Sequence, residues 1–231
     1  MKSITEIQQE YGPQLAKAAL GLGAIKLRPE APFTWASGYR MPIYNDNRQF
    51  LAVPACRALI RDAFADMVEA LGLQDVENIS GTATAGIPHA VTLADKLEKP
   101  MSYVRSSAKD HGMGNQIEGL ASGSFEGKKV LLIEDLISTG SSSIKALEAI
   151  RAAQGDCGVC LAIFTYGLDK AAAAFAALEP PCSVYTILDY DTMVRTALAE
   201  GYVSEENAES LRQWRQSPFT WGEEHGFPKE G

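Results

Sequence analysis

The sequence lacks the features of a membrane or secreted protein. Its longest uncharged apolar stretch, residues 157–168, falls short of the roughly 18 residues that a membrane-spanning helix needs. Residues 1–6 lack the apolar core that a signal peptide would have. These absences favour a cytoplasmic location.

The chain also lacks an excess of basic residues. Its 21 Lys and Arg are outnumbered by 29 Asp and Glu, and the net charge of -8 disfavours a general nucleic-acid-binding protein. Hydrophobic residues make up 46% and charged residues 22%, which is ordinary for a globular protein. A length of 231 residues fits one α/β domain with a small appended part.

Four cysteines are too few for a disulfide framework in a chain of this length. Cys157 and Cys160 have the spacing of a redox or zinc pair, but they open a β-branched and aromatic run that predicts a strand. Residues three apart on a strand point to opposite faces, so we expect the two thiols to diverge. We therefore predict buried structural cysteines.

Residues 130–143 are the most informative stretch. The apolar run from Val130 to Ile133 predicts a strand buried on both faces, which we expect to end at two carboxylates. A loop of small and hydroxyl residues follows, and a helical pattern begins near Ile144. Such an order presents several backbone N–H groups to one anion, so it predicts a phosphate cradle.

The adjacent carboxylates of Glu134 and Asp135 make this loop unusual. Beside a phosphate they would be repulsive unless they faced ribose hydroxyls or a bridging divalent cation. They could also stabilise positive charge at the anomeric carbon of a sugar. The pattern thus predicts a phosphosugar site, and it matches neither the P-loop nor the dinucleotide fingerprint. An ordinary strand-to-helix turn capped by Asp135 is the alternative.

Alternating strand and helix patterns predict an α/β fold with a mainly parallel sheet. We expect residues 1–50 to form an N-terminal helix and hood, 51–215 the core, and 216–231 a peripheral tail without periodicity. Asp191 is expected to cap a late helix. A second glycine-rich strand-to-helix turn spans residues 81–88, although alone it is weak support for a diphosphate site.

Two segments suit a hood and a lid. Residues 32–48 are rich in aromatics and proline, which suits an irregular hood able to close over a flat heterocycle. Residues 105–119 contain three glycines and no apolar periodicity, which predicts a mobile loop. Its Arg105, Lys109 and His111 would bring cations to the phosphate cradle.

Residues 133–142 resemble the phosphoribosyl-diphosphate loop of type I phosphoribosyltransferases. The lid residues 103–119, the hood residues 33–48 and the turn at 81–88 resemble the orotate phosphoribosyltransferase family in particular. The resemblance runs from about residue 1 to 215. It implies the type I phosphoribosyltransferase fold, with a central mainly parallel sheet flanked by helices and a small N-terminal hood. It also implies transfer of the phosphoribosyl group of 5-phosphoribosyl 1-diphosphate to orotate in pyrimidine biosynthesis.

The resemblance also implies roles for individual residues. Arg105, Lys109 and His111 would contact the diphosphate as catalytic cations, with Lys109 the main one. Ser138 would also touch orotate. Magnesium would arrive on the diphosphate rather than on protein ligands, and the lid would be supplied by the partner subunit of a homodimer. The phosphoribosyl half would be held by Glu134, Asp135, Leu136, Ile137, Ser138, Thr139, Gly140, Ser141 and Ser142.

Some positions depart from the family pattern. Ser106 and Ser107 stand where many relatives carry a lysine, and Ala36 and Gly167 stand where others place a basic residue. How the orotate carboxylate is held is therefore open, with Arg40, Arg48 and backbone amides as candidates.

Two other functions remain as alternatives. One is a salvage phosphoribosyltransferase for a purine or uracil. The other is a non-catalytic sensor that regulates transcription, which should carry a DNA-binding helix pair and a basic face.

Overall fold

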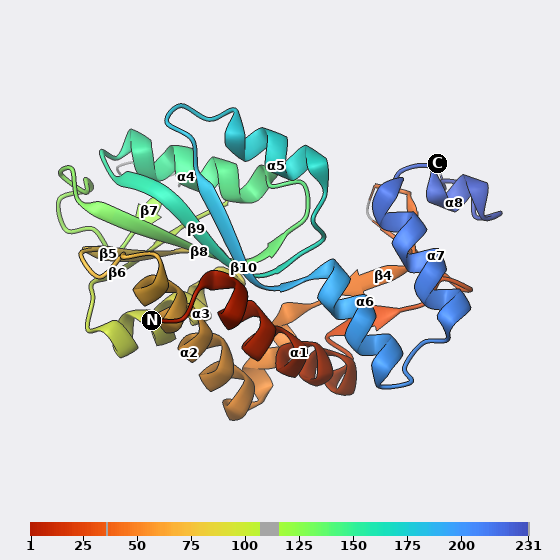
Figure 1. The fold of residues 1–231 in the computed structure, drawn as a ribbon. Coiled ribbons are helices and arrows are strands. Elements are labelled where there is room, and N and C mark those ends of the chain that lie inside the picture. Colours follow the sequence, from red (N-terminus) through yellow and green to blue (C-terminus); the bar gives the residue numbers. More distant parts are fainter. Residues whose placement is uncertain (36, 107–115, 231) are drawn as a thin grey trace.

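A six-stranded sheet organises the protein, whose computed structural model describes residues 1–35, 37–106 and 116–230 (Figure 1). The strand order is β10-β9-β8-β5-β6-β7, and only the pairing of β7 with β6 is antiparallel. The predicted α/β fold with a mainly parallel sheet is confirmed. The strands are β5 (Asn78–Thr82), β6 (Met101–Val104), β7 (Ile117–Glu118), β8 (Lys129–Ile137), β9 (Asp156–Thr165) and β10 (Ser183–Asp189).

Helices cover both faces of the sheet (Figure 1). On one face lie α4 (Ser141–Ala152) and α5 (Asp169–Ala176), and on the other lie α1 (Ile4–Leu22), α2 (Pro54–Ala70) and α3 (Gly86–Leu97). Alternate residues of β8 pack into the two hydrophobic cores on either side of the sheet, because successive side chains of a strand point to opposite faces. Leu131 belongs to the core beneath α1–α3 and Leu132 to the core beneath α4. None of the helices in the described ranges is long and apolar enough to cross a bilayer.

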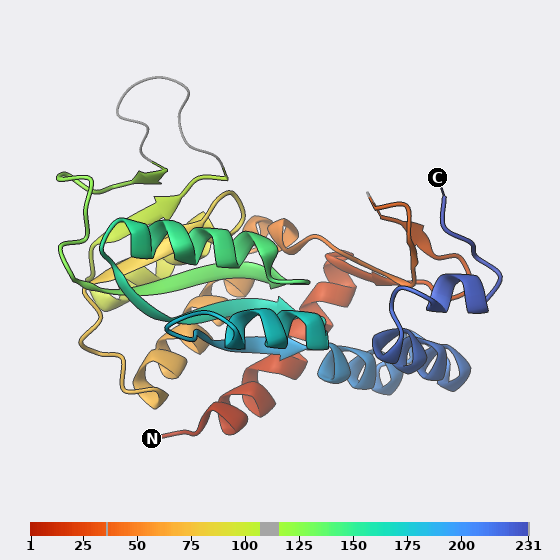
Figure 2. The ribbon, with the colours of Figure 1, turned by 90° about the horizontal axis from the view of Figure 1, so that it is seen from above.

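The hood and the C-terminal segments lie together at one end of the sheet (Figure 2). The hood comprises β1 (Ile25–Leu27) paired with β4 (Ile43–Asn45), the β2–β3 hairpin (Phe33–Thr34 and Arg40–Met41) and the 3-10 helix η1 (Asn47–Ala52). The C-terminal helices are α6 (Tyr190–Ala199), α7 (Glu205–Gln216) and α8 (Trp221–Glu224). Trp214 of α7 joins the two parts, since its ring contacts Trp35 of the hood and its Nε1 donates to Met41 Sδ at 3.0 Å.

The cap of α6 differs from the sequence prediction. Asp189 is the N-cap, because its carboxylate accepts a hydrogen bond from the backbone N–H of Thr192 at 2.7 Å. Asp191 lies in the first turn of the helix instead. The sequence offers two carboxylates two residues apart, and the helix starts at the earlier one because β10 ends there.

The cysteines are buried and free, as predicted, but the expectation that Cys157 and Cys160 diverge is wrong. Both side chains lie in the core beneath α4. The reason is a β-bulge: Lys129 pairs with Asp156 whereas Leu131 pairs with Val159, so β9 carries one extra residue here. An extra residue shifts the alternation by one and turns both thiols to the same face.

The segment after α7 packs against the hood, although we expected it to be peripheral. Trp221 of α8 is only 1% exposed. The ring of Phe219 contacts that of Tyr39 with centroids 5.3 Å apart. The absence of sequence periodicity hid these contacts, because α8 has only four residues and the rest of the segment is irregular.

Candidate active site

The loop that the sequence predicts to be a phosphate cradle lies between β8 and α4. We predicted that strand β8 would end at the two carboxylates. Instead it continues through them to Ile137. Gly140, with φ of 82°, is the N-cap of α4, and the first helical bond runs from Ile144 N–H to its carbonyl at 2.9 Å. The N–H groups of the first turn, at Ser141 to Ser143, therefore precede the helical ladder and point toward the loop. A Cβ at position 140 would lie 2.8 Å from the ring of Phe175, so this turn also needs glycine for packing.

The turn after β5 faces the cradle. Helix α3 begins at Gly86, where a Cβ would lie 2.5 Å from the carbonyl oxygen of Ile133. Only glycine permits this close approach of α3 to β8. The approach sets the turn residues, Thr82 to Ala85, opposite the small-residue loop. The second glycine-rich turn of the sequence thus becomes a wall of the same site.

A polar cavity of about 440 Å³ lies between these elements. Every predicted cradle residue from Glu134 to Ser142 lines it except Ile137. The side chain of Ile137 is buried in the core beneath α4, which leaves only its backbone for the predicted place in the site. The lining residues are Asn45, Asp46, Arg48, Thr82, Ala83, Thr84, Ala85, Glu134, Asp135, Leu136, Ser138, Thr139, Gly140, Ser141 and Ser142.

The two carboxylates of the acidic pair have different environments. Glu134 is only 4% exposed, and its carboxylate accepts hydrogen bonds from Ser143 Oγ and from the backbone N–H of Asp135, both at 2.9 Å. Burial raises the pKa of Glu134, and its neighbour Asp135 adds to the rise. Asp135 is more exposed and faces the cavity. The pair therefore offers one solvent-accessible carboxylate backed by a buried one.

The hood supplies the third wall. Asn47 Nδ2 donates to the backbone carbonyl of Asp135 at 2.6 Å, which ties the hood to the cradle. Next to it, Arg48 pairs with Asp46 at 2.6 Å, and this pairing holds the pKa of Asp46 below its usual value. Sequence reasoning did not single out Asn45 or Asp46 as site residues. Their position at the end of a strand, at the edge where the cradle opens, is the signal that could have found them.

Several buried polar atoms around this cavity have no hydrogen-bond partner within the described part of the chain. They are both polar atoms of the Asn45 amide, Oδ1 of Asn47 and Oγ1 of Thr82. Asn45 and Thr82 line the cavity. A buried polar group without a partner is costly, and native proteins satisfy nearly all of them with protein, water or ligand. Asn45 and Thr82 therefore carry buried polar atoms at the wall of the cavity, without a partner among the described residues.

The predicted lid is only partly described. Arg105 lies at its start, where its backbone N–H donates to the carbonyl of Gln116 at 2.9 Å and its guanidinium contacts Glu118 at 3.4 Å. Arg105 is not among the described residues that line the cavity. Lys109 and His111 lie outside the described residues.

Cations are scarce in the cavity. Among its described lining residues, Arg48 alone carries a positive side chain, against the carboxylates of Asp46, Glu134 and Asp135. An anionic phosphosugar would need further positive charge from elsewhere. Across residues 1–35, 37–106 and 116–230, no three of His, Cys, Asp and Glu gather to hold a metal on protein ligands alone. The carboxylate oxygens suit a hard cation that brings other oxygen ligands with it.

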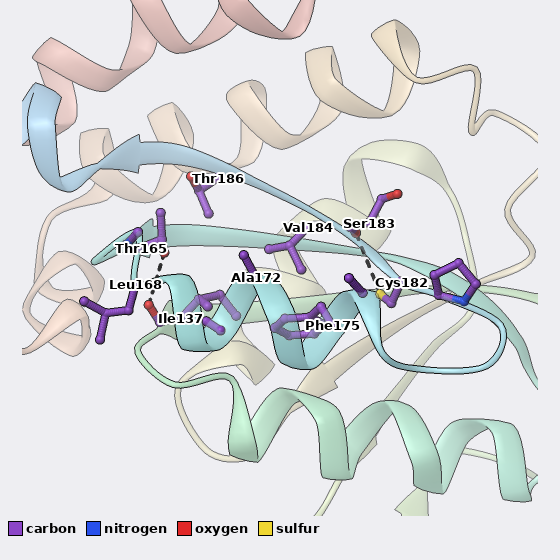
Figure 3. Close-up of a pocket in the computed structure, with 13 residues that line it drawn as sticks. Ile137, Thr165, Leu168, Ala172, Phe175, Cys182, Ser183, Val184 and Thr186 are labelled. Atoms are coloured by element: carbon purple, nitrogen blue, oxygen red, sulfur yellow. Dashed lines mark hydrogen bonds between the residues drawn. The ribbon is translucent and has the colours of Figure 1, made fainter. Parts of the chain in front are cut away.

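A second cavity, of about 460 Å³, lies between α5 and strands β9 and β10 (Figure 3). Ile137 and Thr165 lie at one end of it, and Thr165 Oγ1 donates to the Ile137 carbonyl at 3.2 Å. Leu168, Phe175 and Val184 give it a mainly apolar lining. It offers no charged side chain among its described residues, so it does not suit a phosphosugar.

Comparisons with known proteins identify the family. The model of the phosphoribosyl transferase domain matches residues 46–192, which include the cradle, the lid and the turn at 82–85. The chain belongs to the phosphoribosyltransferase family. The type I phosphoribosyltransferase fold that the sequence predicted is thus confirmed.

Relatives of this phosphoribosyltransferase carry a common name. The chain is 49% identical to the orotate phosphoribosyltransferase of Bacillus caldolyticus over 208 residues, covering 90% of this chain and 98% of that protein. It is 46% identical to the enzyme of that name from Listeria monocytogenes over 209 residues, covering 90% and 97%. The resemblance to the orotate phosphoribosyltransferases that the sequence predicted is confirmed.

A solved structure agrees with this assignment. That of orotate phosphoribosyltransferase from Aeropyrum pernix is 27% identical, with a TM-score of 0.66, and the match covers 82% of this phosphoribosyltransferase and 99% of that chain. The structure of the Mycobacterium tuberculosis enzyme in complex with 5-phospho-α-D-ribosyl 1-diphosphate, at 22% identity and a TM-score of 0.58, supports the fold.

Proposed function

We propose that the protein transfers the phosphoribosyl group of 5-phosphoribosyl 1-diphosphate to orotate, giving orotidine 5′-phosphate and diphosphate in pyrimidine biosynthesis. The names of its relatives support this activity. The observation that carries the proposal is one cavity that combines a loop of small residues at a helix N-terminus, an acidic pair and the unpartnered amide of Asn45. Each of the three suits one part of a nucleotide: phosphate, ribose and base.

The phosphoribosyl half fits the cradle by charge and hydrogen bonding. The first-turn N–H groups of α4 and the hydroxyls of Thr139, Ser141 and Ser142 would hold the 5-phosphate. The carboxylate of Asp135 would accept hydrogen bonds from the ribose hydroxyls, with Glu134 behind it. Positive charge that develops at the anomeric carbon would be stabilised by the same pair. Ser138, at the start of the loop, would reach the base.

The base would bind against the hood. An amide such as that of Asn45 matches the alternating C=O and N–H groups of a pyrimidine ring, since it both donates and accepts. Of the two arginines proposed for the orotate carboxylate, Arg40 is engaged elsewhere: it contacts the Glu230 carboxylate at 2.7 Å and the Pro32 carbonyl at 3.0 Å. Arg48 lines the cavity and is the better candidate.

The chemistry needs cations rather than a strong base. Arg105, Lys109 and His111 would neutralise the leaving diphosphate when the lid closes, and the lid would exclude water. Magnesium bound to the diphosphate oxygens would add charge that the protein's own cavity lacks. Orotate enters as an anion, so no strong base is required. His89 does not fill that role, because it is buried on α3, outside the cavity lining, with its pKa lowered by desolvation to about 4.

A nucleobase screen tests the activity. The purified protein, 5-phosphoribosyl 1-diphosphate and magnesium are mixed with orotate, uracil, adenine, guanine or hypoxanthine, and ultraviolet absorbance is followed. We expect orotate alone to be consumed, with one diphosphate released per turnover. Consumption of another base would favour a salvage enzyme, and binding of 5-phosphoribosyl 1-diphosphate without turnover of any base would favour the sensor.

We further propose that the enzyme is a homodimer whose lid reaches the partner's cradle. The lid's ends are tied together on β6 and β7, and Arg48 is the only cation among the described residues that line the cavity. Mixing Lys109→Ala subunits with Ser142→Asp subunits tests this arrangement. If the lid acts in trans, half of the randomly exchanged dimers are mixed and each has one intact site. Activity should then recover to about a quarter of wild type. No recovery, with exchange confirmed by native mass spectrometry, would show that each subunit uses its own lid.

A further inference from the structure

Residues 217–230, here named the C-terminal clasp, hold the tip of the β2–β3 hairpin. The backbone N–H of Glu230 donates to the Gly38 carbonyl at 2.9 Å, at the turn of the hairpin. Its carboxylate pairs with the guanidinium of Arg40 on β3 at 2.7 Å. The clasp thus contacts the hairpin through both its backbone and a charged side chain.

Aromatic and cationic groups strengthen this contact. Lys229 Nζ lies 4.5 Å from the centre of the Tyr39 ring, and Phe219 contacts the same ring. Phe227 lies under the guanidinium of Arg40 at 5.9 Å. The contacts come from both ends of the clasp, so they fix its whole length rather than one point.

The backbone at Gly222 packs closely against two neighbouring segments of backbone. A Cβ at Gly222, on α8, would lie 2.7 Å from the Phe227 carbonyl oxygen and 3.2 Å from the carbonyl oxygen of Arg40. Trp221 beside it is buried, with its ring stacked 4.7 Å from that of His225. The packing leaves no room for a side chain at position 222, which makes this glycine sensitive to substitution.

The hairpin is joined to the wall of the cavity by a short, well-bonded path. Trp35 on the hairpin donates from Nε1 to the Ile43 carbonyl on β4 at 3.0 Å. Met41, at the end of β3, accepts from Trp214. Strand β4 ends at Asn45, which lines the cavity. A displacement of the hairpin would therefore move the residues that face the base.

We propose that the C-terminal clasp positions the hood, so that Asn45 and Arg48 meet the pyrimidine base in a fixed pose. Arg40 and Glu230 are then positioning residues: they touch each other and not the substrate. This inference rests on the proposed function and adds the prediction that orotate affinity depends on a segment remote from the cavity.

Full-length variants test the clasp. Glu230→Arg places two cations together, and Gly222→Ala wedges α8 away from Phe227. Glu230→Arg should raise the KM for orotate about threefold to fivefold, the upper part of the range expected for one exposed ion pair. Gly222→Ala should also raise it. Both variants should leave the KM for 5-phosphoribosyl 1-diphosphate and kcat unchanged. Arg40→Glu combined with Glu230→Arg restores the pair with reversed signs and should recover much of the affinity. Glu224→Arg, an equal charge change on an exposed position of α8, is the control.

Hydrogen exchange separates this inference from the proposed function. The backbone amides of the β2–β3 hairpin should exchange faster in Glu230→Arg and Gly222→Ala than in the wild type. Unchanged exchange, or faster exchange with an unchanged KM for orotate, would overturn the positioning role. If the wild-type protein does not consume orotate, the proposed function is wrong, and the exchange rates alone then decide whether the clasp holds the hairpin.

Discussion

The cradle and the hood reach the same cavity by different routes. The cradle is one contiguous stretch, from Glu134 to Ser142, whose shape follows from a strand end, a glycine and a helix start. The hood wall depends on segments far apart in the sequence. Trp35 packs on Trp214 and Tyr166, and Asn47 bonds to Asp135. A local loop can hold an anion through its backbone, whereas recognition of a base needs side chains that the tertiary structure brings together.

The largest effect on activity should come from a substitution in the lid, which we propose acts together with the cradle. Lys109→Ala removes a charge needed mainly as diphosphate leaves, so kcat should fall about a thousandfold. Stability should hardly change, because a lid carries little of the core. Steady-state kinetics and thermal unfolding check both points, with the exposed Lys170→Ala on α5 as control. Near-normal turnover would remove Lys109 from catalysis.

A charge placed in the cradle should act on one substrate only. Ser142→Asp puts a carboxylate where the 5-phosphate is expected, so the KM for 5-phosphoribosyl 1-diphosphate should rise about a hundredfold through like-charge repulsion. The side chain is exposed, so the fold should tolerate it. Ser183→Asp, an exposed position at the start of β10, is the matched control. Equal increases in both KM values would mean that the cradle does not act separately from the hood.

A substitution in the hood should affect the other substrate, orotate. Asn45→Ala should raise the KM for orotate about tenfold, because one or two hydrogen bonds to the base are lost. The KM for 5-phosphoribosyl 1-diphosphate should not change. Stability of the apo protein should not fall, since both polar atoms of this amide lack partners among the described residues. Asn207→Ala, which removes a bonded amide outside the cavity lining, is the comparison. A destabilised variant with normal orotate affinity would show that Asn45 is structural.

The last effect concerns stability rather than kinetics, and it is a pH dependence of the apo protein. Because the folded-state pKa of Glu134 is raised above its ordinary 4.5, the folded state holds this proton more tightly than the unfolded state does. Its contribution to stability is present below that ordinary value and is lost as pH rises through the raised one. Within this window the slope should approach about 1.4 kcal/mol per pH unit.

Urea unfolding across this range should show a flatter pH profile in Glu134→Gln than in the wild type. The glutamine keeps the side-chain shape and the bond from Ser143, but it cannot ionise. Parallel profiles for the two proteins would show that Glu134 is ionised in the folded apo state.

Most of the fold and the cradle could be predicted from the sequence because their signals are local. The apolar run of β8, the glycine at 140 and the helical pattern after it specify a strand, a turn and a helix without reference to other residues. The burial of the Ile137 side chain could not be predicted in this way, since a resemblance names a stretch whereas strand alternation decides which side chains face the site.

The remaining features depend on tertiary contacts. The shared face of Cys157 and Cys160 comes from a bulge that only strand pairing reveals. Asn45 and Thr82 stand out only through unpartnered buried atoms around a cavity, and the sequence does not show which atoms are buried. The C-terminal clasp has no periodic pattern, because its contacts with the hairpin are irregular and aromatic.

The division of the cavity between cradle and hood is tested most directly by a crystal structure of the complex with orotidine 5′-phosphate. We expect the phosphate on the first-turn N–H groups of α4, the ribose hydroxyls on Asp135, and the pyrimidine ring against Asn45 and Arg48. A pyrimidine ring in the apolar cavity between α5 and β10, or a phosphate held away from Ser141 and Ser142, would contradict the account.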